Sequence, residues 1–325
     1  MKRAFLAAAA ILSAQPALAF DCKQAASEAE KAICATPAAL AADADMNKAY
    51  SALRAVLDAS QRAAAAKAQV AWLGQRDAAC VGKQGGDLGA CLADETGKRS
   101  RFLSAAPEAG PGYSGKLAPF FRIEPGGKGK TDVDVQAFEF PSPANGAERA
   151  FNAAVDKALG DIVQPDADDK TDTYAFALTM TLAYASPRLL SAHAEVYTDL
   201  GGAHPNSYTF DINVDPEEGR ALAFDDLVDQ AAAQKVFAHC YDQVLATKKA
   251  NEGDDANLDA PALKQLQGDV AAATGKLTNW SFGLKSATVN YAPYAVGAYA
   301  EGSFSCEAPY AFLRPLAKPA FPLPP

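Results

Sequence analysis

Apolar residues recur at helical spacing over the first third of the chain. One set follows a four-three-four spacing: Met46, Tyr50, Leu53 and Leu57. This set predicts a helix from about Pro37 to Leu57, with the proline in the first turn, where its missing N–H is tolerated. A second set falls at offsets zero, three, four, seven and eleven: Gln69, Trp72, Leu73, Arg76 and Cys80. It lines one face of another helix. With shorter helices expected over 24–33 and 88–103, the pattern indicates a small bundle.

Further along the chain, the period of the pattern changes to two. Over residues 173–185, large apolar side chains alternate with Ala and Thr: Tyr174, Phe176, Leu178, Met180, Leu182 and Tyr184. Such alternation predicts a strand with one apolar face. Similar patterns predict further strands at 189–198, 207–214, 280–284 and 287–291, and helices at 148–162, 230–248 and 261–273. Because strands mostly follow one another through short turns, we expect an α+β domain with an antiparallel sheet.

A stretch rich in small residues, Pro and Gly separates these two patterns. It reads SAAPEAGPGYSGKLAP from Ser104 to Pro119 and shows no apolar periodicity, which indicates a linker. We therefore predict a multidomain chain, in which a small all-α, disulfide-stapled helical bundle precedes the α+β domain. The expected boundaries are 20–104 for the bundle, 105–116 for the linker, 117–316 for the α+β domain and 317–325 for a Pro-rich tail.

The first residues have the pattern of an export signal. Lys2 and Arg3 precede an apolar run from Ala4 to Leu12, and Ala17-Leu18-Ala19 supplies the small residues of a cleavage site. A secretory signal peptide is expected at 1–19, with cleavage near Ala19 leaving a periplasmic or secreted protein. The run is shorter than the roughly 18 apolar residues of a membrane helix, and no later segment reaches that length, so no membrane span is expected.

Composition and charge exclude several classes of protein. The 325 residues are 49% hydrophobic, which is typical of a globular chain and not of a disordered one. There are 30 basic and 39 acidic residues, and loss of Lys2 and Arg3 with the signal would leave 28 basic residues and a net charge of −11. A nucleic-acid partner is not expected, because phosphate contacts need a basic surface. The acidity favours a basic protein partner, or it serves only solubility.

Six cysteines, four of them early in the chain, predict three disulfides in an oxidising compartment. If 24–33 is helical, Cys22 and Cys34 lie at opposite ends of a rod roughly 15 Å long and cannot pair. An antiparallel helix pair would place Cys34 near Cys80 and leave Cys22 for Cys91. Pairing of Cys80 with Cys91 is the competing arrangement. The remaining two, Cys240 and Cys306, are expected to pair with each other.

The N-terminal motifs resemble a known family. The runs FDCKQAASEAEKAIC, QVAWLGQRDAAC and CLADETGKRSRFL, with Leu40, Asp43, Met46 and Tyr50 between the first two, are similar to the LprI-like family of secreted lysozyme inhibitors over about 20–104. Two departures from the family pattern stand at Ala42 and at Thr96-Gly97, where glycine weakens a helix. Four charged positions are expected to form structural ion pairs, in preference to direct partner contacts: Asp43, Arg76, Asp77 and Arg99.

The C-terminal motifs resemble a second family. The blocks GGAHPN and PYAVGAYAEG, with LLSAHAEVYTD and DPEEGRALAFDDL, are similar over about 115–316 to the extracytoplasmic domain of RsiV-type anti-sigma factors, which are lysozyme receptors. The resemblance implies the same ligand as the N-terminal one. The candidate partner-binding residues are Gly201, Gly202, His204, Pro205, Asn206, Tyr197 and Tyr208.

His204 has two interpretations. Its imidazole could hydrogen-bond to the carboxylates of a lysozyme cleft, or it could satisfy a backbone group in its own glycine-rich turn. The tyrosines of this region divide in the same way between core and exposed binding surface: Tyr197, Tyr208, Tyr291, Tyr294 and Tyr299.

Enzymatic chemistry finds little support in the sequence. Only three histidines are present, and the chain contains neither HExxH, nor Cys-x-x-Cys, nor a GxSxG elbow. We expect no metal, no cofactor and no catalytic residues, although an unrecognised hydrolase is a third possibility. The sequence predicts a periplasmic lysozyme-binding protein that inhibits a muramidase by sterically occluding its cleft. The alternative is an envelope module that binds or senses peptidoglycan. Aromatic residues along an open groove would favour glycan, whereas a projecting loop beside an acidic surface would favour protein.

Overall fold

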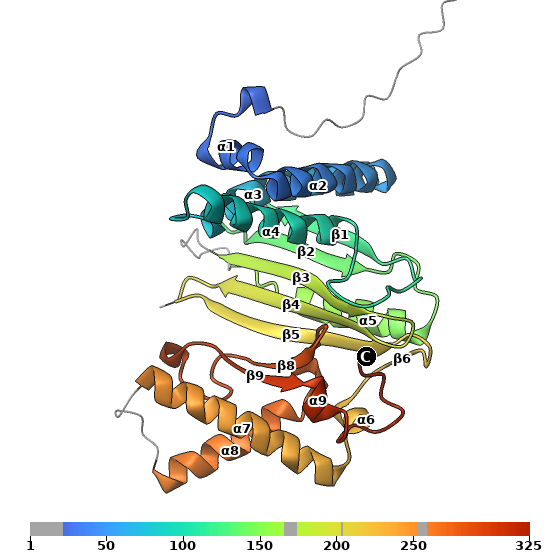
Figure 1. Ribbon diagram of the computed structural model, residues 1–325, viewed down its shortest axis with the longest axis vertical. Coiled ribbons are helices and arrows are strands. Elements are labelled where there is room, and N and C mark those ends of the chain that lie inside the picture. Colours follow the sequence, from blue (N-terminus) through green and yellow to red (C-terminus); the bar gives the residue numbers. More distant parts are fainter. Residues whose placement is uncertain (1–21, 166–173, 203, 253–258) are drawn as a thin grey trace, which may run out of the picture. The chain divides into compact units, whose positions relative to one another are not determined.

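The computed structural model describes residues 22–165, 174–202, 204–252 and 259–325 (Figure 1). The predicted signal peptide lies outside these residues. The chain divides into two compact units and passes between them after Val56, after Leu73 and after Ser100. The first unit contains residues up to Val56 and Gly74–Ser100, and the second contains Leu57–Leu73 and Arg101–Pro325. Among the described residues, no helix is long and apolar enough to cross a membrane.

The N-terminal region is helical, as predicted. After the 3-10 turn η1 (Cys22–Gln24) come α1 (Glu28–Ala35), α2 (Pro37–Val56), α3 (Ala59–Ala79) and α4 (Gly85–Leu103). The start of α1 is fixed by a capping box, in which Ser27 accepts from the backbone N–H of Glu30 and the Glu30 carboxylate accepts from that of Ser27. α4 continues through Thr96 and Gly97 without a break. Apolar side chains from three helices form the core of the first unit: Ile33, Ala39 and Leu92.

The predicted disulfide pairing within this region is wrong. Cys22 pairs with Cys34, and Cys80 pairs with Cys91, in place of Cys22 with Cys91 and Cys34 with Cys80. The error came from the helix start, because α1 begins at Glu28 and not near residue 24. The non-helical residues 25–27 let the chain fold back, so the Cα atoms of Cys22 and Cys34 lie only 5.7 Å apart. The predicted third disulfide, Cys240–Cys306, is confirmed.

The second unit contains a six-stranded sheet whose order in space follows the chain. Its strands are β1 (Ala118–Glu124), β2 (Asp132–Glu139), β3 (Ala175–Ala185), β4 (Leu190–Asp199), β5 (Asn206–Asp215) and β6 (Arg220–Ala221). All pairs are antiparallel except β2–β3, which is parallel and is joined through α5 (Gly146–Leu159). Phe151 and Val155 of α5 pack with Leu178, Val196 and Ile212 in a core on one face of this sheet.

The second unit also contains a three-stranded sheet, two long helices and two short ones (Figure 1). The strands are β7 (Trp280–Phe282), β8 (Ser286–Tyr291) and β9 (Phe304–Pro309), and the helices are α6 (Phe224–Leu227), α7 (Gln230–Glu252), α8 (Ala260–Thr274) and α9 (Tyr310–Leu313). Two 3-10 turns, η3 (Leu277–Asn279) and η4 (Tyr299–Glu301), flank the strands. The Asn213 amide of β5 donates to the carbonyls of Leu277 and Trp280, at 2.9 and 2.7 Å, and so fixes the smaller sheet to the larger one.

The stretch predicted as a linker pairs with β3. The backbone N–H of Glu108 donates to the carbonyl of Leu182 at 2.8 Å, and that of Gly112 donates to Ala185 at 2.9 Å. The Tyr113 hydroxyl donates to the Glu148 carboxylate of α5 at 2.7 Å. Residues 105–116 are therefore held by hydrogen bonds within the second unit.

Candidate functional site

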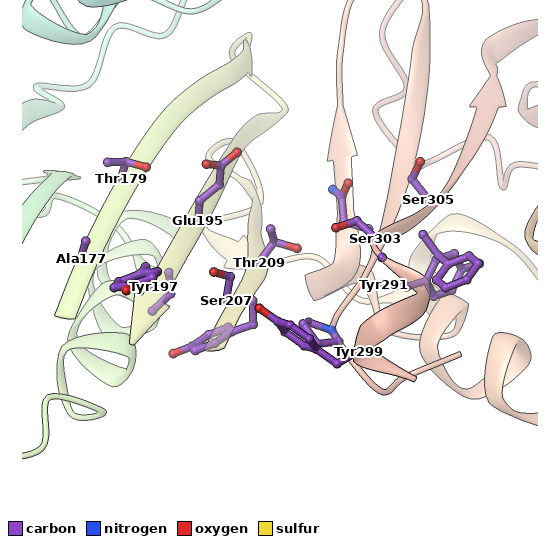
Figure 2. Close-up of a pocket in the computed structure, with 16 residues that line it drawn as sticks. Ala177, Thr179, Glu195, Tyr197, Ser207, Thr209, Tyr291, Tyr299, Ser303 and Ser305 are labelled. Carbon is purple, nitrogen blue, oxygen red and sulfur yellow. The ribbon is translucent and has the colours of Figure 1, made fainter. Parts of the chain in front are cut away.

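A groove of about 690 Å³ opens in the second unit between the two sheets, and we name it the tyrosine groove (Figure 2). Strands β3, β4 and β5 form one side, and β8, β9 and the segment between them form the other. Its lining combines tyrosines with hydroxyl and amide side chains: Ala177, Thr179, Glu195, Val196, Tyr197, Ser207, Tyr208, Thr209, Asn290, Tyr291, Pro293, Tyr299, Gly302, Ser303, Phe304 and Ser305.

The polar floor of the groove follows from strand alternation. Thr179 lies opposite Glu195, which lies opposite Thr209, so three polar side chains cross the sheet in one row. Ala177, Tyr197 and Ser207 form the next row by the same register. The intervening residues of each strand point to the face that packs on α5. The period-two pattern therefore places the apolar core and the polar floor on opposite faces of one sheet.

The other side of the groove is held from beneath. Asn290 and Ser305 are directly paired across β8 and β9. The Tyr291 hydroxyl shares a 2.8 Å hydrogen bond with that of Thr274, and burial raises the pKa of Tyr291 to about 12. Lys248 of α7 forms an ion pair with Glu301 of η4. This ion pair anchors the short turn that carries Tyr299.

Three of the seven residues predicted to bind a partner lie at this groove. Tyr197 and Tyr208 line it, and the His204 ring stacks on Tyr299 with centroids 4.5 Å apart. His204 Nδ1 lies 2.8 Å from the carbonyl of Pro205, which is the local backbone contact considered for it. Of the rest, Gly201 has φ 70° and donates to Asp199, Gly202 is exposed, and Asn206 begins β5.

The tyrosines divide between core and surface. Tyr291 is only 5% exposed, whereas Tyr197 and Tyr299 are 38% and 37% exposed and Tyr294 is 63% exposed. Tyr208 packs its ring on the α5 core and donates its hydroxyl to Asp161 at 2.6 Å. Burial of Tyr208, followed by this hydrogen bond, raises the pKa of the phenol. Exposed tyrosine rings thus lie at the groove mouth.

A histidine–carboxylate pair lies one row further along the sheet. His193 Nδ1 is 2.8 Å from the buried Asp211 carboxylate, and the Asn290 amide contacts the second Asp211 oxygen at 3.4 Å. Burial disfavours the charged imidazole, but the hydrogen bond to Asp211 and the charges of Asp211, Glu195 and Glu108 outweigh it, so the pKa of His193 is raised. The remaining histidine, His239, bonds to the Glu307 carbonyl and stacks on Phe312.

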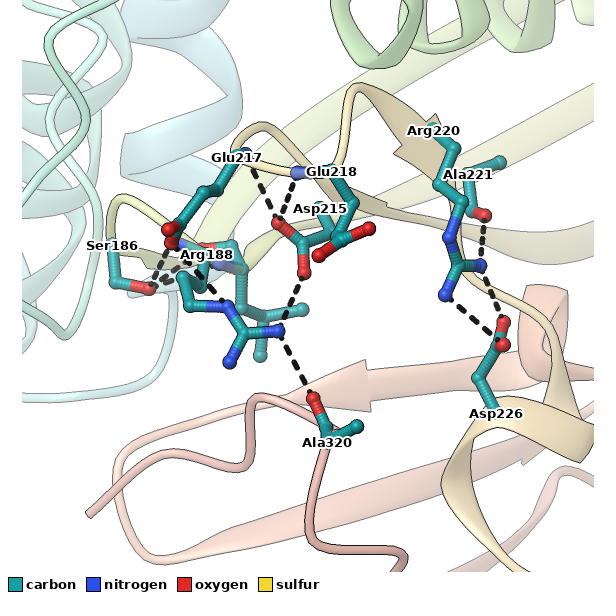
Figure 3. A network of polar contacts seen from close by, with 10 residues as sticks. Ser186, Arg188, Asp215, Glu217, Glu218, Arg220, Ala221, Asp226 and Ala320 are labelled. Carbon is teal, nitrogen blue, oxygen red and sulfur yellow. Dashed lines mark hydrogen bonds and ion pairs between the residues drawn. The ribbon is translucent and has the colours of Figure 1, made fainter.

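Another charged cluster of the second unit has a structural role (Figure 3). Arg188 pairs with Asp215 at 3.1 Å and donates to the carbonyl of Ala320 at 3.0 Å. Arg220 forms a bidentate pair with Asp226. The hydrogen bond from Arg188 to Ala320 holds the C-terminal segment, whose Phe321 is buried in the core of the smaller sheet. Among the described residues, no group of three or more His, Cys, Asp or Glu side chains is placed to hold a metal ion.

The first unit presents a loop closed by the Cys80–Cys91 disulfide, which we name the disulfide loop (residues 80–91). Val81 in this loop is 81% exposed, and Gly82 and Gly85 have φ values of 80° and 53°, conformations that favour glycine. A shallow hollow of about 590 Å³ lies beside it, lined by Gly82, Lys83, Gln84, Asp87, Ala90 and Cys91. This loop was not among the predicted binding residues.

The predicted ion-pair residues are mostly buried. Asp43, Arg76 and Arg99 are 5–6% exposed, whereas the Asp77 side chain is 47% exposed. Arg76 donates twice to one Asp77 oxygen, at 2.8 and 2.9 Å, and Asn47 donates to Asp43 at 2.9 Å. These residues contribute to the interior of the helical region.

Charge is distributed unevenly along the chain. Residues 22–103 carry 11 basic and 9 acidic side chains, whereas residues 104–325 carry 17 basic and 29 acidic ones. The acidity of the protein therefore belongs to the part that follows the helical region. Yet the described residues that line the tyrosine groove include one carboxylate, Glu195, and no Lys or Arg.

Comparisons with known proteins bear on the helical region. Residues 22–103 match the family model of the lysozyme inhibitor LprI. That family consists of non-catalytic binding proteins. The match supports a lysozyme-inhibitor-like function for this region, and the three disulfides are typical of an exported protein. No curated protein matches the chain.

Two solved structures are similar to about two thirds of the chain. One is a DUF3298 family protein from Pseudomonas aeruginosa PAO1, with 17% identity, a TM-score of 0.46, and coverage of 66% of this chain and 100% of that one. The other is a DUF3298 family member from Bacteroides fragilis NCTC 9343, with 14% identity, a TM-score of 0.44, and coverage of 63% and 94%. Neither comparison names an RsiV-type domain, so that part of the resemblance stays a prediction.

Proposed function

We propose that this chain is a periplasmic or secreted protein that binds a lysozyme-type muramidase and inhibits it by occupying the cleft. The single observation that carries the proposal is the LprI family match over residues 22–103. Inhibition by occlusion requires no chemistry on the target. It requires only a surface that keeps its shape and excludes the substrate.

The disulfide loop is the part of the first unit that best meets this requirement. Its two ends are tied by Cys80–Cys91, and Val81 projects an apolar side chain into solvent. A loop that is already constrained loses little conformational entropy on binding, and an exposed apolar side chain gains free energy when a cleft covers it. We therefore propose that Val81 and its neighbours enter the muramidase cleft.

The test is a titration of the full chain into a muramidase digesting cell walls, with hen-type, goose-type and invertebrate-type enzymes in parallel. The full chain is used because the boundary between the units falls within α3. Saturable inhibition of at least one type is expected. Val81→Asp should raise the inhibition constant about tenfold or more, because the carboxylate must be desolvated in the cleft.

Val56 provides a matched control. It lies in the same unit, at the end of α2, and is also 81% exposed. Val56→Asp should change the inhibition constant less than about twofold, and neither variant should lower the melting temperature, since both side chains are in water. Equal inhibition by the Val81 variant would remove the disulfide loop from the interface. Absence of inhibition with all three enzyme types would overturn the proposed function.

A further inference from the structure

The mouth of the tyrosine groove exposes aromatic rings that are held in place. Tyr299 stacks on His204, and its turn is anchored by the Glu301–Lys248 ion pair and by an amide hydrogen bond from Asn251 to the Glu301 carbonyl. Tyr294 lies 6.0 Å from Tyr299, ring centroid to centroid. Exposed rings that are already ordered provide contact area to a ligand at low entropic cost.

An unusual backbone conformation is found beside the mouth of the tyrosine groove, at Tyr294. Tyr294 has φ 65°, in the left-handed region that non-glycine residues rarely adopt, and its side chain is 63% exposed. Such strain persists only where the surrounding structure imposes it, and it clusters at ligand-binding sites. Here the conformation belongs to a β-turn, in which the backbone N–H of Ala295 donates to the carbonyl of Ala292 at 3.0 Å, and this turn presents the exposed ring beside Tyr299.

The floor and far side of the groove offer hydrogen bonds without positive charge. Hydroxyl groups come from both sheets, through Thr179 and Thr209 on one side and Ser305 on the other. The Asn290 amide lies among them, and the Glu195 carboxylate is 72% exposed. Because no Lys or Arg is found among the described residues of the lining, a phosphate or carboxylate ligand would find no counter-charge there and would be repelled by Glu195. A purely apolar ligand would leave the polar floor desolvated and unpaired.

From these features we infer that the tyrosine groove binds an uncharged oligosaccharide. Sugar rings have C–H faces that pack on aromatic rings, here Tyr197 and Tyr299, and hydroxyl groups that pair with the Thr, Ser, Asn and Glu side chains of the floor. The volume of about 690 Å³ lies within the roughly 300–1,000 Å³ typical of small-ligand sites. His204 and Tyr197, which were predicted to contact a partner, would then belong to a saccharide site, whereas the Tyr208 side chain packs on the α5 core.

This inference goes beyond the proposed function and does not depend on it. A chain that holds wall glycan through its second unit and a muramidase through its first would raise the local concentration of the inhibitor where the enzyme works. The muramidase and the glycan would occupy different parts of the chain. Their binding should therefore be separable by mutation.

Calorimetric titration of the full chain with triacetylchitotriose tests the inference, with maltotriose as an unacetylated arm and, as a wall-derived arm, glycan strands whose lactyl carboxylates have been amidated so that they are uncharged. Saturable binding of at least one of these is expected. Tyr299→Ala and Tyr197→Ala should each weaken it about tenfold, which corresponds to about 1.4 kcal/mol. Tyr50→Ala, on α2 of the first unit, is the control and should bind like the wild type. Thermal melting shows whether each variant is folded.

The opposing outcomes are distinct from failure of the proposed function. Absence of saturable binding by all three saccharides at about 10 mM, or wild-type affinity in both groove variants, would overturn the inference. Loss of muramidase inhibition in the Tyr299 and Tyr197 variants, without saccharide binding by the wild type, would also overturn it and assign the groove to the protein partner. Saccharide binding by a chain that inhibits no muramidase would support the groove and reject only the proposed function.

Discussion

At the scale of single residues, the His193–Asp211 pair should make the stability of the second unit depend on pH. The folded-state pKa of His193 is raised above its usual 6.5 because the contact and charge of Asp211 outweigh burial. A raised histidine pKa stabilises the fold fully below about pH 6.5, and this contribution is lost as pH rises through the folded-state value. The stability of the second unit should therefore fall above neutral pH.

The measurement is urea unfolding of the wild type and of His193→Gln at about pH 6 and pH 9. We expect the wild type to lose more stability than the variant over this interval. Only the wild type contains the His193 imidazolium, which loses its proton between these two pH values. An NMR titration of the His193 ring should give a pKa above that of a free histidine. An identical pH dependence in both proteins would show that the pair contributes no net charge interaction.

Sequence pattern predicted the residue types of the candidate site better than their arrangement. Tyr197 and Tyr208 were identified, but the polar row of Thr179, Glu195 and Thr209 was not. The alternation at 173–185 already separated these positions from the apolar face. What it could not show is that strands from another sheet would cover them, because Asn290 and Ser305 lie far along the chain.

At the scale of elements, the largest error was the disulfide pairing of the N-terminal region, and it came from a misplaced helix start. Ser27 and Glu30 are three residues apart, which is the spacing of a capping box, and this signal would have placed the start of α1 at Glu28. With that start, Cys22 and Cys34 can meet. Strands β1, β2 and β9 were also missed, and β1 contains adjacent apolar residues in place of alternation.

The edge strand β1 has an unusual partner on α3. The Gln61 side-chain amide donates to the carbonyl of Phe121 at 3.0 Å and accepts from its backbone N–H at 3.1 Å, so it replaces a neighbouring strand at this position. Edge strands with unpaired backbone groups invite association with other chains. We expect Gln61→Ala to lower the free energy of unfolding of the second unit by about 1–2 kcal/mol, because both backbone groups lose their partner.

Lys67→Ala provides the control for this helix, since its side chain is exposed on α3. It should change stability by less than about 0.5 kcal/mol. Hydrogen exchange of the Phe121 amide gives a local readout and should accelerate only in the Gln61 variant. Unchanged exchange in that variant would mean that the amide pair does not protect the strand.

At the scale of the whole molecule, composition concealed a division of charge. The overall net charge is −9, but residues 22–103 carry a small basic excess and residues 104–325 carry the acidic one. Similarly, no compositional shift marks the point within α3 where the chain passes from one compact unit to the other. The charge division can be counted from the sequence, whereas the boundary within α3 depends on which segments pack together, which local pattern does not report.

The division of charge predicts how a basic muramidase would associate with the chain. Long-range attraction must come from the acidic second unit even if the first unit makes the contact. Three exposed carboxylates of that unit lie outside the groove lining and can be neutralised together, as Asp225→Asn, Asp242→Asn and Glu307→Gln. The association rate constant should fall severalfold at low salt, with little change in dissociation, because steering acts before contact.

Stopped-flow binding at several salt concentrations measures this effect. The wild-type rate should fall as ionic strength rises, since the Debye length shrinks to about 8 Å at 0.15 M, and the triple variant should show a weaker dependence. Neutral substitutions in the near-neutral first unit should leave the slope unchanged. If the triple variant keeps the wild-type salt dependence, the acidity of the second unit does not steer the muramidase, and solubility is the better account of that charge.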